Sequence, residues 1–486
     1  MTEGVGNKVR SGVKLTFLTT VASGLLQVVL LVVLSRLLMP RDYGYYIAAL
    51  ALANTSTGLS SSILERTLVV QQGEVAPSGR TATIIFVVVA SVALVTFAVA
   101  WIATSLTSWT MPPGVLGTLL VAQIIASIGV VPRVNWRRRL LFRRIVFGEM
   151  ASQIVAGALL SIALSAAGWG AQGLAFAQVF GSIVIVVAVT WGSGLRLSGF
   201  RPEELFVLVR SAGQLGRIAA LEIANAQIPS LLLTLLAGPT ALGLFNRAYT
   251  VVQLPVQLLT TSMTRVMISA LVLMVDDRNR LQSGMRRLVQ FAATIVSPVA
   301  FGIAGSHKAF TAVLLGGKWL EAAPLMPFLA IGTWTVMMGY LFSILSEATR
   351  HFAQKVRIQV ASTLVLVFGI VAGSRFGLIG ASGAMAVAGT VFLMFYMWLG
   401  AQILGLSVTQ VARWMVPGFG AGLLCGISSW LLGQVFADLS PFVQLVIQVG
   451  DCGLVTVLFY LVFYRPLLAE IVRMAIPHRF VPRFLD

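Results

Sequence analysis

Nine polar residues that could bind a ligand or an ion lie within or at the ends of long apolar segments. They are two arginines, five carboxamides and two carboxylates: Arg36 and Arg247; Gln27, Asn54, Asn225, Gln227 and Gln253; Glu222 and Asp451. The planar guanidinium of arginine stays charged and binds phosphate-like oxygens in pairs. A carboxamide can donate to and accept from hydroxyl groups, and it costs less to bury than a charge.

Each of these residues also has a purely structural interpretation. Arg36 and Arg247 lie near the expected outer ends of helices, where a long side chain can reach lipid headgroups. The carboxamides can form hydrogen bonds between membrane helices, and Glu222 could pair with Arg217. A carboxylate at membrane depth is nevertheless a functional candidate, because it is costly to keep there. We therefore predict that Glu222 and Asp451 take part in ion coupling.

The composition indicates the elements that must position these residues. Of 486 residues, 58% are hydrophobic and 10% are charged, whereas soluble domains are roughly 45–50% apolar and about 25% charged. Apolar runs of helical length recur along the chain, and strand-like alternation is absent. We predict an all-α polytopic membrane protein with fourteen transmembrane helices, near 15–38, 44–64, 82–105, 114–132, 146–167, 171–193, 214–236, 242–264, 287–304, 324–346, 357–374, 378–404, 414–437 and 441–464.

The distribution of basic residues predicts the orientation. Lys and Arg accumulate in cytoplasmic loops. With both termini in the cytoplasm, the outer ends carry only a few of the 34 basic residues, namely Arg36, Arg41, Arg247, Lys308, Lys318 and Arg375. The net charge of +18 is then explained by orientation and by contact with anionic membrane lipids, without nucleic acid. No cleavable signal peptide is expected, and the location implied by the family resemblance given below is the bacterial inner membrane.

Two further residue classes argue against catalysis and cofactors. The only cysteines, Cys425 and Cys452, lie in apolar runs and are expected to be core residues, with no disulfide framework, metal or cofactor. His307, His351 and His478 are scattered over loops and the tail, which does not suit a membrane polymerase or ligase that needs positioned acid–base groups. The chain is therefore not expected to be an enzyme.

Two pairs of segments indicate an internal repeat. In the first pair, Pro40 aligns with Pro239 and Gly44 with Gly243, each 199 residues apart. In the second pair, "GWGAQGLAFAQ" from Gly168 aligns with "RFGLIGASGAM" from Arg375. Six predicted helices separate the copies, an even number, so both halves enter the membrane in the same direction. This arrangement is a parallel repeat about an axis along the membrane normal, with a site between the halves near the midplane.

The repeat predicts two six-helix lobes followed by two extra helices. The linker "LRLSGFRPEELFVLVRSAG" is expected to be an amphipathic cytoplasmic helix that begins at Pro202. The predicted boundaries are 1–194 for the first lobe, 195–213 for the linker, 214–404 for the second lobe, 405–464 for helices 13 and 14, and 465–486 for a basic cytoplasmic tail.

Three motifs carry a resemblance to a known family: "LSRLLMPRDYGYY", "ALGLFNRAY" and "VLLGGKWLEAAPLMPFLA". The chain resembles the Wzx-type polysaccharide exporters of the multidrug/oligosaccharidyl-lipid/polysaccharide (MOP) flippase superfamily. The resemblance implies transport of undecaprenyl-pyrophosphate-linked oligosaccharide units by alternating access, for exopolysaccharide or lipopolysaccharide biosynthesis. It also implies a polysaccharide polymerase and a chain-length regulator as partners, and H+ or Na+ as the coupling cation.

On this interpretation the arginines contact the pyrophosphate and the carboxamides contact the sugar hydroxyls. Two alternatives share the general fold. One is a MurJ-like flippase for a peptidoglycan precursor, which also has a cationic cavity. The other is a MATE-like drug or cation antiporter, which would favour an acidic, aromatic cavity.

Overall fold

The computed structural model consists of helices, with no strand among the residues that it describes. The described residues are 19, 22–58, 78–106, 112–139, 141–194, 198–199, 202–272 and 274–466, and the side chains of 103–106, 142, 202–220, 224, 258–270 and 272 are not described. Contacts divide the chain into two compact units, Met1–Asn246 and Arg247–Asp486.

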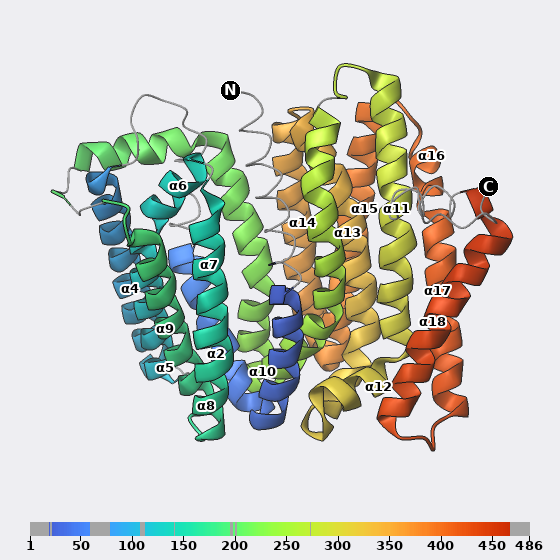
Figure 1. Ribbon diagram of the computed structural model, residues 1–486, viewed down its shortest axis with the longest axis horizontal. Coiled ribbons are helices and arrows are strands. Elements are labelled where there is room, and N and C mark those ends of the chain that lie inside the picture. The colour runs from blue at the N-terminus through green and yellow to red at the C-terminus, as the bar shows by residue number, and fades with distance from the viewer. Residues whose placement is uncertain are drawn as a thin grey trace. The chain divides into compact units, whose positions relative to one another are not determined.

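The first unit contains an apolar helix at Ala22–Leu37 and part of the long helix α10. In order, its labelled elements are α2 (Pro40–Ala53), η1 (Asn54–Gly58), α4 (Gly79–Leu106), α5 (Pro113–Ile128), α6 (Val130–Arg138), α7 (Phe142–Ser152), η2 (Gln153–Leu160), α8 (Ser161–Ala166), α9 (Gly170–Thr190) and the beginning of α10 (Pro202–Val272). Helix α9 packs against both α5 and α7 (Figure 1).

Prolines define several of these helix starts. Pro40 begins α2, Pro113 begins α5 and Pro202 begins α10 as the sequence predicts. Proline suits the first helical position because its fixed φ is helical and its missing N–H would be unpaired there anyway.

The second unit contains the rest of α10 and the helices that follow it. They are α11 (Arg278–Gly305), α12 (His307–Phe310), η3 (Thr311–Leu315), η4 (Gly317–Leu325), α13 (Met326–Ala348), α14 (Phe352–Gly373), η5 (Ser374–Phe376), α15 (Gly377–Leu404), α16 (Val408–Arg413), α17 (Val416–Val435) and α18 (Pro441–Phe463). Helix α11 starts where the Asp277 carboxylate accepts hydrogen bonds from the backbone N–H groups of Asn279 and Arg280.

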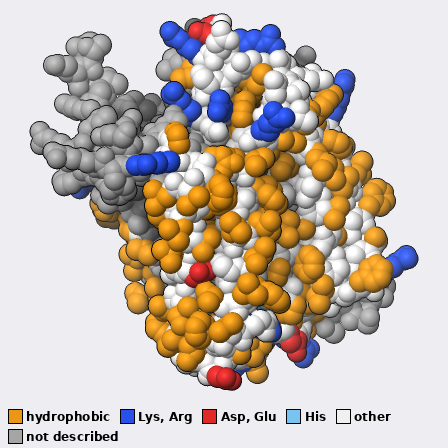
Figure 2. Space-filling view, turned by 90° about the vertical axis from the view of Figure 1, so that its right-hand side faces the viewer, with side chains coloured by type: hydrophobic (Ala, Val, Ile, Leu, Met, Phe, Trp, Pro, Cys, Tyr) orange, Lys and Arg blue, Asp and Glu red, His pale blue; other side chains and the backbone are white. Residues whose placement is uncertain are grey.

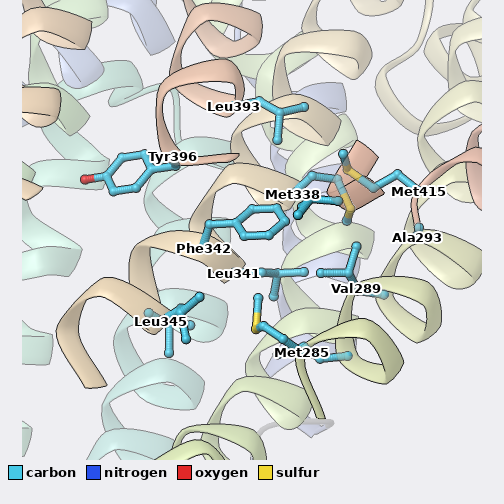
Figure 3. Packing of buried hydrophobic residues seen from close by; sticks show 14 of the residues in the cluster. Met285, Val289, Ala293, Met338, Leu341, Phe342, Leu345, Leu393, Tyr396 and Met415 are labelled. Carbon is cyan, nitrogen blue, oxygen red and sulfur yellow. The ribbon is translucent and has the colours of Figure 1, made fainter. Parts of the chain in front are cut away.

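The core of the second unit lies among α11, α13 and α15 (Figure 3). Met285 and Val289 of α11 face Leu341 and Phe342 of α13, and all four are at most 6% exposed. Unbranched methionine fills irregular gaps between helices whose aliphatic and aromatic side chains have fixed shapes. This packing holds α11, α13 and α15 together.

Small residues bring α11 and α17 into backbone contact. A Cβ added to Gly418 would lie 2.4 Å from the backbone carbonyl group of Ala293, and one added to Gly422 would lie 2.8 Å from that of Ser297. The four-residue spacing places both glycines on one face of α17, which is the usual way in which membrane helices approach closely.

The second pair of repeated segments folds alike in the two units. Gly170 begins α9 with φ +51°, and Gly377 begins α15 with φ +71°. Gly173 and Gly380, three residues later in each copy, both lie too close to the preceding helix to accept a Cβ. Glycine is needed at the first position for the left-handed backbone and at the second for close approach.

The helices confirm a multi-pass membrane protein. Ten helical segments among the described residues are long and apolar enough to cross a membrane, and the segments 221–257 and 352–404 contain 37 and 53 residues. Figure 2 shows one face on which hydrophobic side chains cover the middle and most of the Lys and Arg side chains in view lie towards the top. The number fourteen and the lobe boundaries stay predictions, and parts of the first two predicted spans and most of the tail fall outside the described residues.

Candidate functional site

The first pair of repeated segments forms two turns that contact each other within the first unit. We call Pro40–Gly44 the first outer turn and Pro239–Gly243 the second outer turn, after the side on which the basic-residue pattern places them. Before the first, Met39 has an extended backbone that separates α2 from the preceding helix. Before the second, Gly238 has φ +82° within α10, a left-handed conformation that favours glycine.

The contact between the outer turns is reciprocal. A Cβ on Gly44 would lie 1.7 Å from the carbonyl oxygen of Pro239, and a Cβ on Gly243 would lie 2.0 Å from the carbonyl oxygen of Pro40. Each glycine therefore lies directly against the proline of the other turn. A side chain at either position would collide with backbone, so the approach requires glycine at both positions.

A side-chain hydrogen bond adds to this contact. The hydroxyl of Tyr43 donates to Oδ1 of Asn246 at 3.1 Å. Next to it, the guanidinium of Arg41 donates to the Tyr45 hydroxyl at 3.1 Å and lies 5.5 Å from the centre of that ring. Hydrogen bonding to Tyr45 is the main cause that raises the pKa of Arg41, a side chain that is exposed.

The candidate residues on the first predicted hairpin lie in different environments. Arg36 and Gln27 have exposed side chains, and Ser35 beside them is fully buried. Asn54 is half-buried at the start of the π-helical segment η1, where its Oδ1 accepts a hydrogen bond from Nε2 of Gln123 at 2.9 Å. Gln123 of α5 is thus a polar partner of Asn54 that sequence reasoning missed, although a lone amide in the apolar run of α5 was a visible signal.

Three candidates lie close together along α10. Glu222, Asn225 and Gln227 are half-buried, and Oδ1 of Asn225 is buried without a hydrogen-bond partner among the described residues. Because residues three to four apart share a helix face, Glu222 and Asn225 point to the same side of α10. A carboxylate and an unpaired carbonyl oxygen on one face offer acceptor oxygens to a cation or to a hydroxyl donor.

In the second unit, Arg247 is enclosed. Its side chain is 3% exposed and its guanidinium carbon lies 5.7 Å from the centre of the Trp319 ring, which is itself fully buried. Trp319 lies in η4, which begins directly after Gly316, whose φ is +90°. The segment "VLLGGKW" therefore carries the aromatic partner of Arg247, and the tryptophan is a second residue that sequence reasoning missed.

The remaining candidates of the second unit are Gln253 and Asp451, both half-buried. Asp451 lies in α18, where its Oδ2 accepts a hydrogen bond of 2.6 Å from the hydroxyl of Ser428 in α17. Cys425 and Cys452 are free thiols in the same two helices. Among the described residues, no group of three or more His, Cys, Asp and Glu side chains could hold a metal ion.

The predicted residues thus fall into two sets. The first unit contains six of them: Gln27, Arg36, Asn54, Glu222, Asn225 and Gln227. The second unit contains Arg247, Gln253 and Asp451. The structure joins the two outer turns by direct contact and joins Asn54 to a neighbouring helix. The ligand-binding and ion-coupling roles of all nine residues stay predictions.

Comparisons with known proteins agree with this architecture. A family model described as "Polysaccharide biosynthesis protein" matches residues 33–324, a range that contains both outer turns and Trp319. The chain is 24% identical over 389 residues to the "Succinoglycan biosynthesis transport protein ExoT" of Rhizobium meliloti (strain 1021), which covers 76% of this chain and 75% of that protein. It is also 24% identical to the "Lipopolysaccharide biosynthesis protein WzxC" of Escherichia coli (strain K12), over 43% of each protein.

Solved structures share the fold. One is described as "Lipid II flippase MurJ, inward closed conformation", with a TM-score of 0.74, 13% identity, and coverage of 93% of this chain and 99% of that one. Another is an inward-facing multidrug resistance MATE family transporter of the MOP superfamily, with a TM-score of 0.60, 12% identity, and coverage of 82% and 99%. At these identities the likeness shows the fold alone.

Proposed function

Because the chain belongs to the polysaccharide biosynthesis protein family, we propose that it is an inner-membrane exporter of lipid-linked oligosaccharide units. The substrate is an undecaprenyl-pyrophosphate-linked repeat unit, and the protein moves it from the cytoplasmic to the outer side by alternating access. The single observation that carries this proposal is the family match, which spans both outer turns and the segment that holds Trp319 against Arg247.

The chemistry of the candidate residues supports this class of substrate. A pyrophosphate needs cationic groups that bind oxygens without losing their charge, which suits Arg36 and Arg247. A glycan presents many hydroxyls, which suit carboxamide side chains. The carboxamides available here are Gln27, Asn54, Gln123, and Asn225, Gln227 and Gln253 of α10. Groups that do not titrate release a neutral, hydroxyl-rich ligand readily, because each hydrogen bond to them is worth only about 1 kcal/mol net.

Ion coupling is assigned to the two half-buried carboxylates. Glu222 shares a face of α10 with the unpaired Oδ1 of Asn225, and Asp451 is held by Ser428. Either carboxylate can take up a proton, and an Asp or Glu with neighbouring neutral oxygens can also accept Na+. A polysaccharide polymerase and a chain-length regulator are the partners that would consume the exported units.

A flipping assay tests the proposal. Purified protein in liposomes is given a fluorescent undecaprenyl-pyrophosphate-linked oligosaccharide, and the labelled lipid that reaches the opposite leaflet is measured with a membrane-impermeant quencher. Transport above protein-free liposomes is expected. A parallel arm with lipid II separates the alternative function, because preferential movement of lipid II would replace the present proposal with a peptidoglycan-precursor flippase.

A further inference from the structure

Asp451 lies near the middle of α18, where the interface between α17 and α18 changes in character. It follows Pro441 by ten residues, which is about 15 Å along a helix in a hydrocarbon core that is roughly 30 Å thick. The loop that joins α17 to α18 lies at one end of this interface, on the side that the basic-residue pattern predicts to be outer. Outward from this carboxylate the interface is polar, and inward it is aromatic.

The outer half of the interface is lined by glutamines and a serine. Gln448, three residues before Asp451, lies on the same side of α18, and its Nε2 donates to the carbonyl oxygen of Ser429 at 2.8 Å. One turn further out, Nε2 of Gln444 donates to the carbonyl oxygen of Gly433 at 2.9 Å. A Cβ on Gly433 would lie 2.8 Å from Nε2 of Gln448, so glycine leaves the room that the amide occupies.

Two oxygens in this outer half are enclosed and have no protein partner. Oε1 of Gln448 and Oγ of Ser429 lack a hydrogen bond among the described residues, and their side chains are 3% and 1% exposed. Buried polar atoms are rarely left unpaired, and inside proteins a water molecule often completes their hydrogen bonds. Because the Gln448 amide is bonded to the backbone of Ser429, both oxygens belong to the same turn of the interface. They indicate a hydrated position about one turn outward from Asp451.

The inner half of the interface is filled by rings. A Cβ on Gly420 of α17 would lie 3.1 Å from the Phe459 ring. The centre of that ring lies 5.3 Å from that of Phe463 and 5.6 Å from that of Tyr460. The Tyr460 hydroxyl donates to Thr294 of α11 at 2.8 Å. Close packing of these side chains excludes a chain of water, which prevents a proton from crossing directly from Asp451 to the inner side.

We propose that the outer half of the α17–α18 interface is a proton path that loads Asp451 from the outer side, so that H+ is the coupling ion at this carboxylate. A proton from the outer water binds the carboxylate and gives the neutral acid. Ser428, whose hydroxyl lies 2.6 Å from Asp451, and water at Gln448 would pass the proton, because hydroxyls and water both donate and accept. Gln448 is a positioning residue, since its amide holds water without exchanging a proton. The inference deepens the proposed ion coupling and rests on it.

Other groups near Asp451 must be separated from it by experiment. The titratable or charged side chains on the helices around it are Cys425 in α17, Cys452 and Tyr460 in α18, and His307 and Lys308 in α12, which packs against α18. Helix α11 contacts α18 with the neutral groups of Thr294 and Pro298. Both cysteines are therefore replaced by alanine in every variant, and His307→Gln controls for titration in α12.

The first experiment measures water access along the interface. The variants Gln448→Cys and Ser429→Cys probe the outer half, and Thr456→Cys probes the inner half. Val449→Cys is the matched control on α18, since Val449 is 54% exposed to the surrounding lipid. Asp438→Cys, in the exposed loop between the two helices, marks the outer side. Ag+ is added to right-side-out or inverted membrane vesicles, and a thiol that Ag+ blocks no longer reacts with a maleimide after denaturation.

Gln448→Cys and Ser429→Cys should be blocked from the side on which Asp438→Cys reacts. Thr456→Cys and Val449→Cys should stay unblocked from that side. Absence of blocking at both outer positions, blocking only from the opposite side, or equal blocking of Thr456→Cys would overturn the path. The measurement does not involve substrate. If the parent protein moves no lipid-linked oligosaccharide, the proposed substrate fails, whereas the Ag+ pattern still decides whether the path exists.

The second experiment tests proton loading with the flipping assay. Liposomes that carry the protein with the α17–α18 loop outside receive an acid pulse, and the rise in flipping is measured. The rise should fall by roughly tenfold or more in Gln448→Leu and Asp451→Asn, because a positioned proton-transfer chain is lost. His307→Gln and Gln402→Leu, the latter at an exposed amide of α15, should respond like the parent protein. An unchanged response in Gln448→Leu would refute proton loading through this interface.

Discussion

Arg247 is a buried cation next to an aromatic ring. It lies against the Trp319 ring with 3% of its side chain exposed, and a cation over an indole face is stabilised by about 0.5–2 kcal/mol. Arg36, its proposed counterpart, is exposed. If the substrate is a pyrophosphate, each arginine would supply charge-assisted hydrogen bonds worth about 1.5–3 kcal/mol.

Replacing Arg36 and Arg247 together by alanine is therefore expected to lower flipping by about a hundredfold, since 1.4 kcal/mol corresponds to a factor of ten. The protein should still insert and accumulate. Arg41→Ala is the matched control, because this arginine is exposed and bound only to Tyr45 among the contacts described. Normal transport by the double variant in the liposome assay would remove the arginines from the binding site.

Glu222 and Asp451 are tested by amide substitutions that keep their shape. Glu222→Gln and Asp451→Asn can still accept hydrogen bonds but cannot bind a proton or neutralise a cation. The response of flipping to an imposed H+ or Na+ gradient should fall strongly, while transport without a gradient continues. Glu321→Gln, at an exposed carboxylate of η4, should respond like the parent protein. An intact gradient response in both amide variants would exclude the two carboxylates as coupling groups.

At the scale of whole helices, the glycine face of α17 determines how closely it approaches α11. Gly422→Ala would insert a methyl group 2.8 Å from the Ser297 backbone, and overpacking of this kind costs about 1–3 kcal/mol. We expect a lower thermal unfolding midpoint in detergent by a few degrees. Gly453→Ala in α18 meets no atom within 4 Å and should melt like the parent protein. Equal midpoints for the two variants would contradict tight α11–α17 packing.

At the scale of the whole molecule, the orientation in the membrane is a prediction from charge. Lys318 and Arg280 have exposed side chains and are predicted to lie on opposite sides. In a protein without its native cysteines, Lys318→Cys should react with an impermeant maleimide in intact spheroplasts. Arg280→Cys should react only after permeabilisation. The reverse pattern would invert the topology and place the outer turns in the cytoplasm.

The amino-acid sequence alone determined that this is a helical membrane protein. In a bilayer the backbone polar groups must be hydrogen-bonded within the protein, and an apolar α-helix that is long enough to span the bilayer meets this requirement. It also predicted the helix start at Pro202, since the fixed φ of proline suits the first helical position. The sequence also showed that the turns at Pro40 and Pro239 are equivalent positions of a repeat. It did not show that the two turns touch, because an alignment gives no information on the distance between equivalent residues.

Only the tertiary structure decided which distant residues became neighbours. Gln123 donates a hydrogen bond to Asn54, and Arg247 lies over the Trp319 ring, and neither pairing can be inferred from the segments in which these residues lie. Gly44 and Gly243 could have been flexible turn residues, but the carbonyl groups of Pro239 and Pro40 leave no room for a side chain there. Local patterns report which face of a helix is apolar, whereas the pairing of faces depends on packing summed over the whole fold.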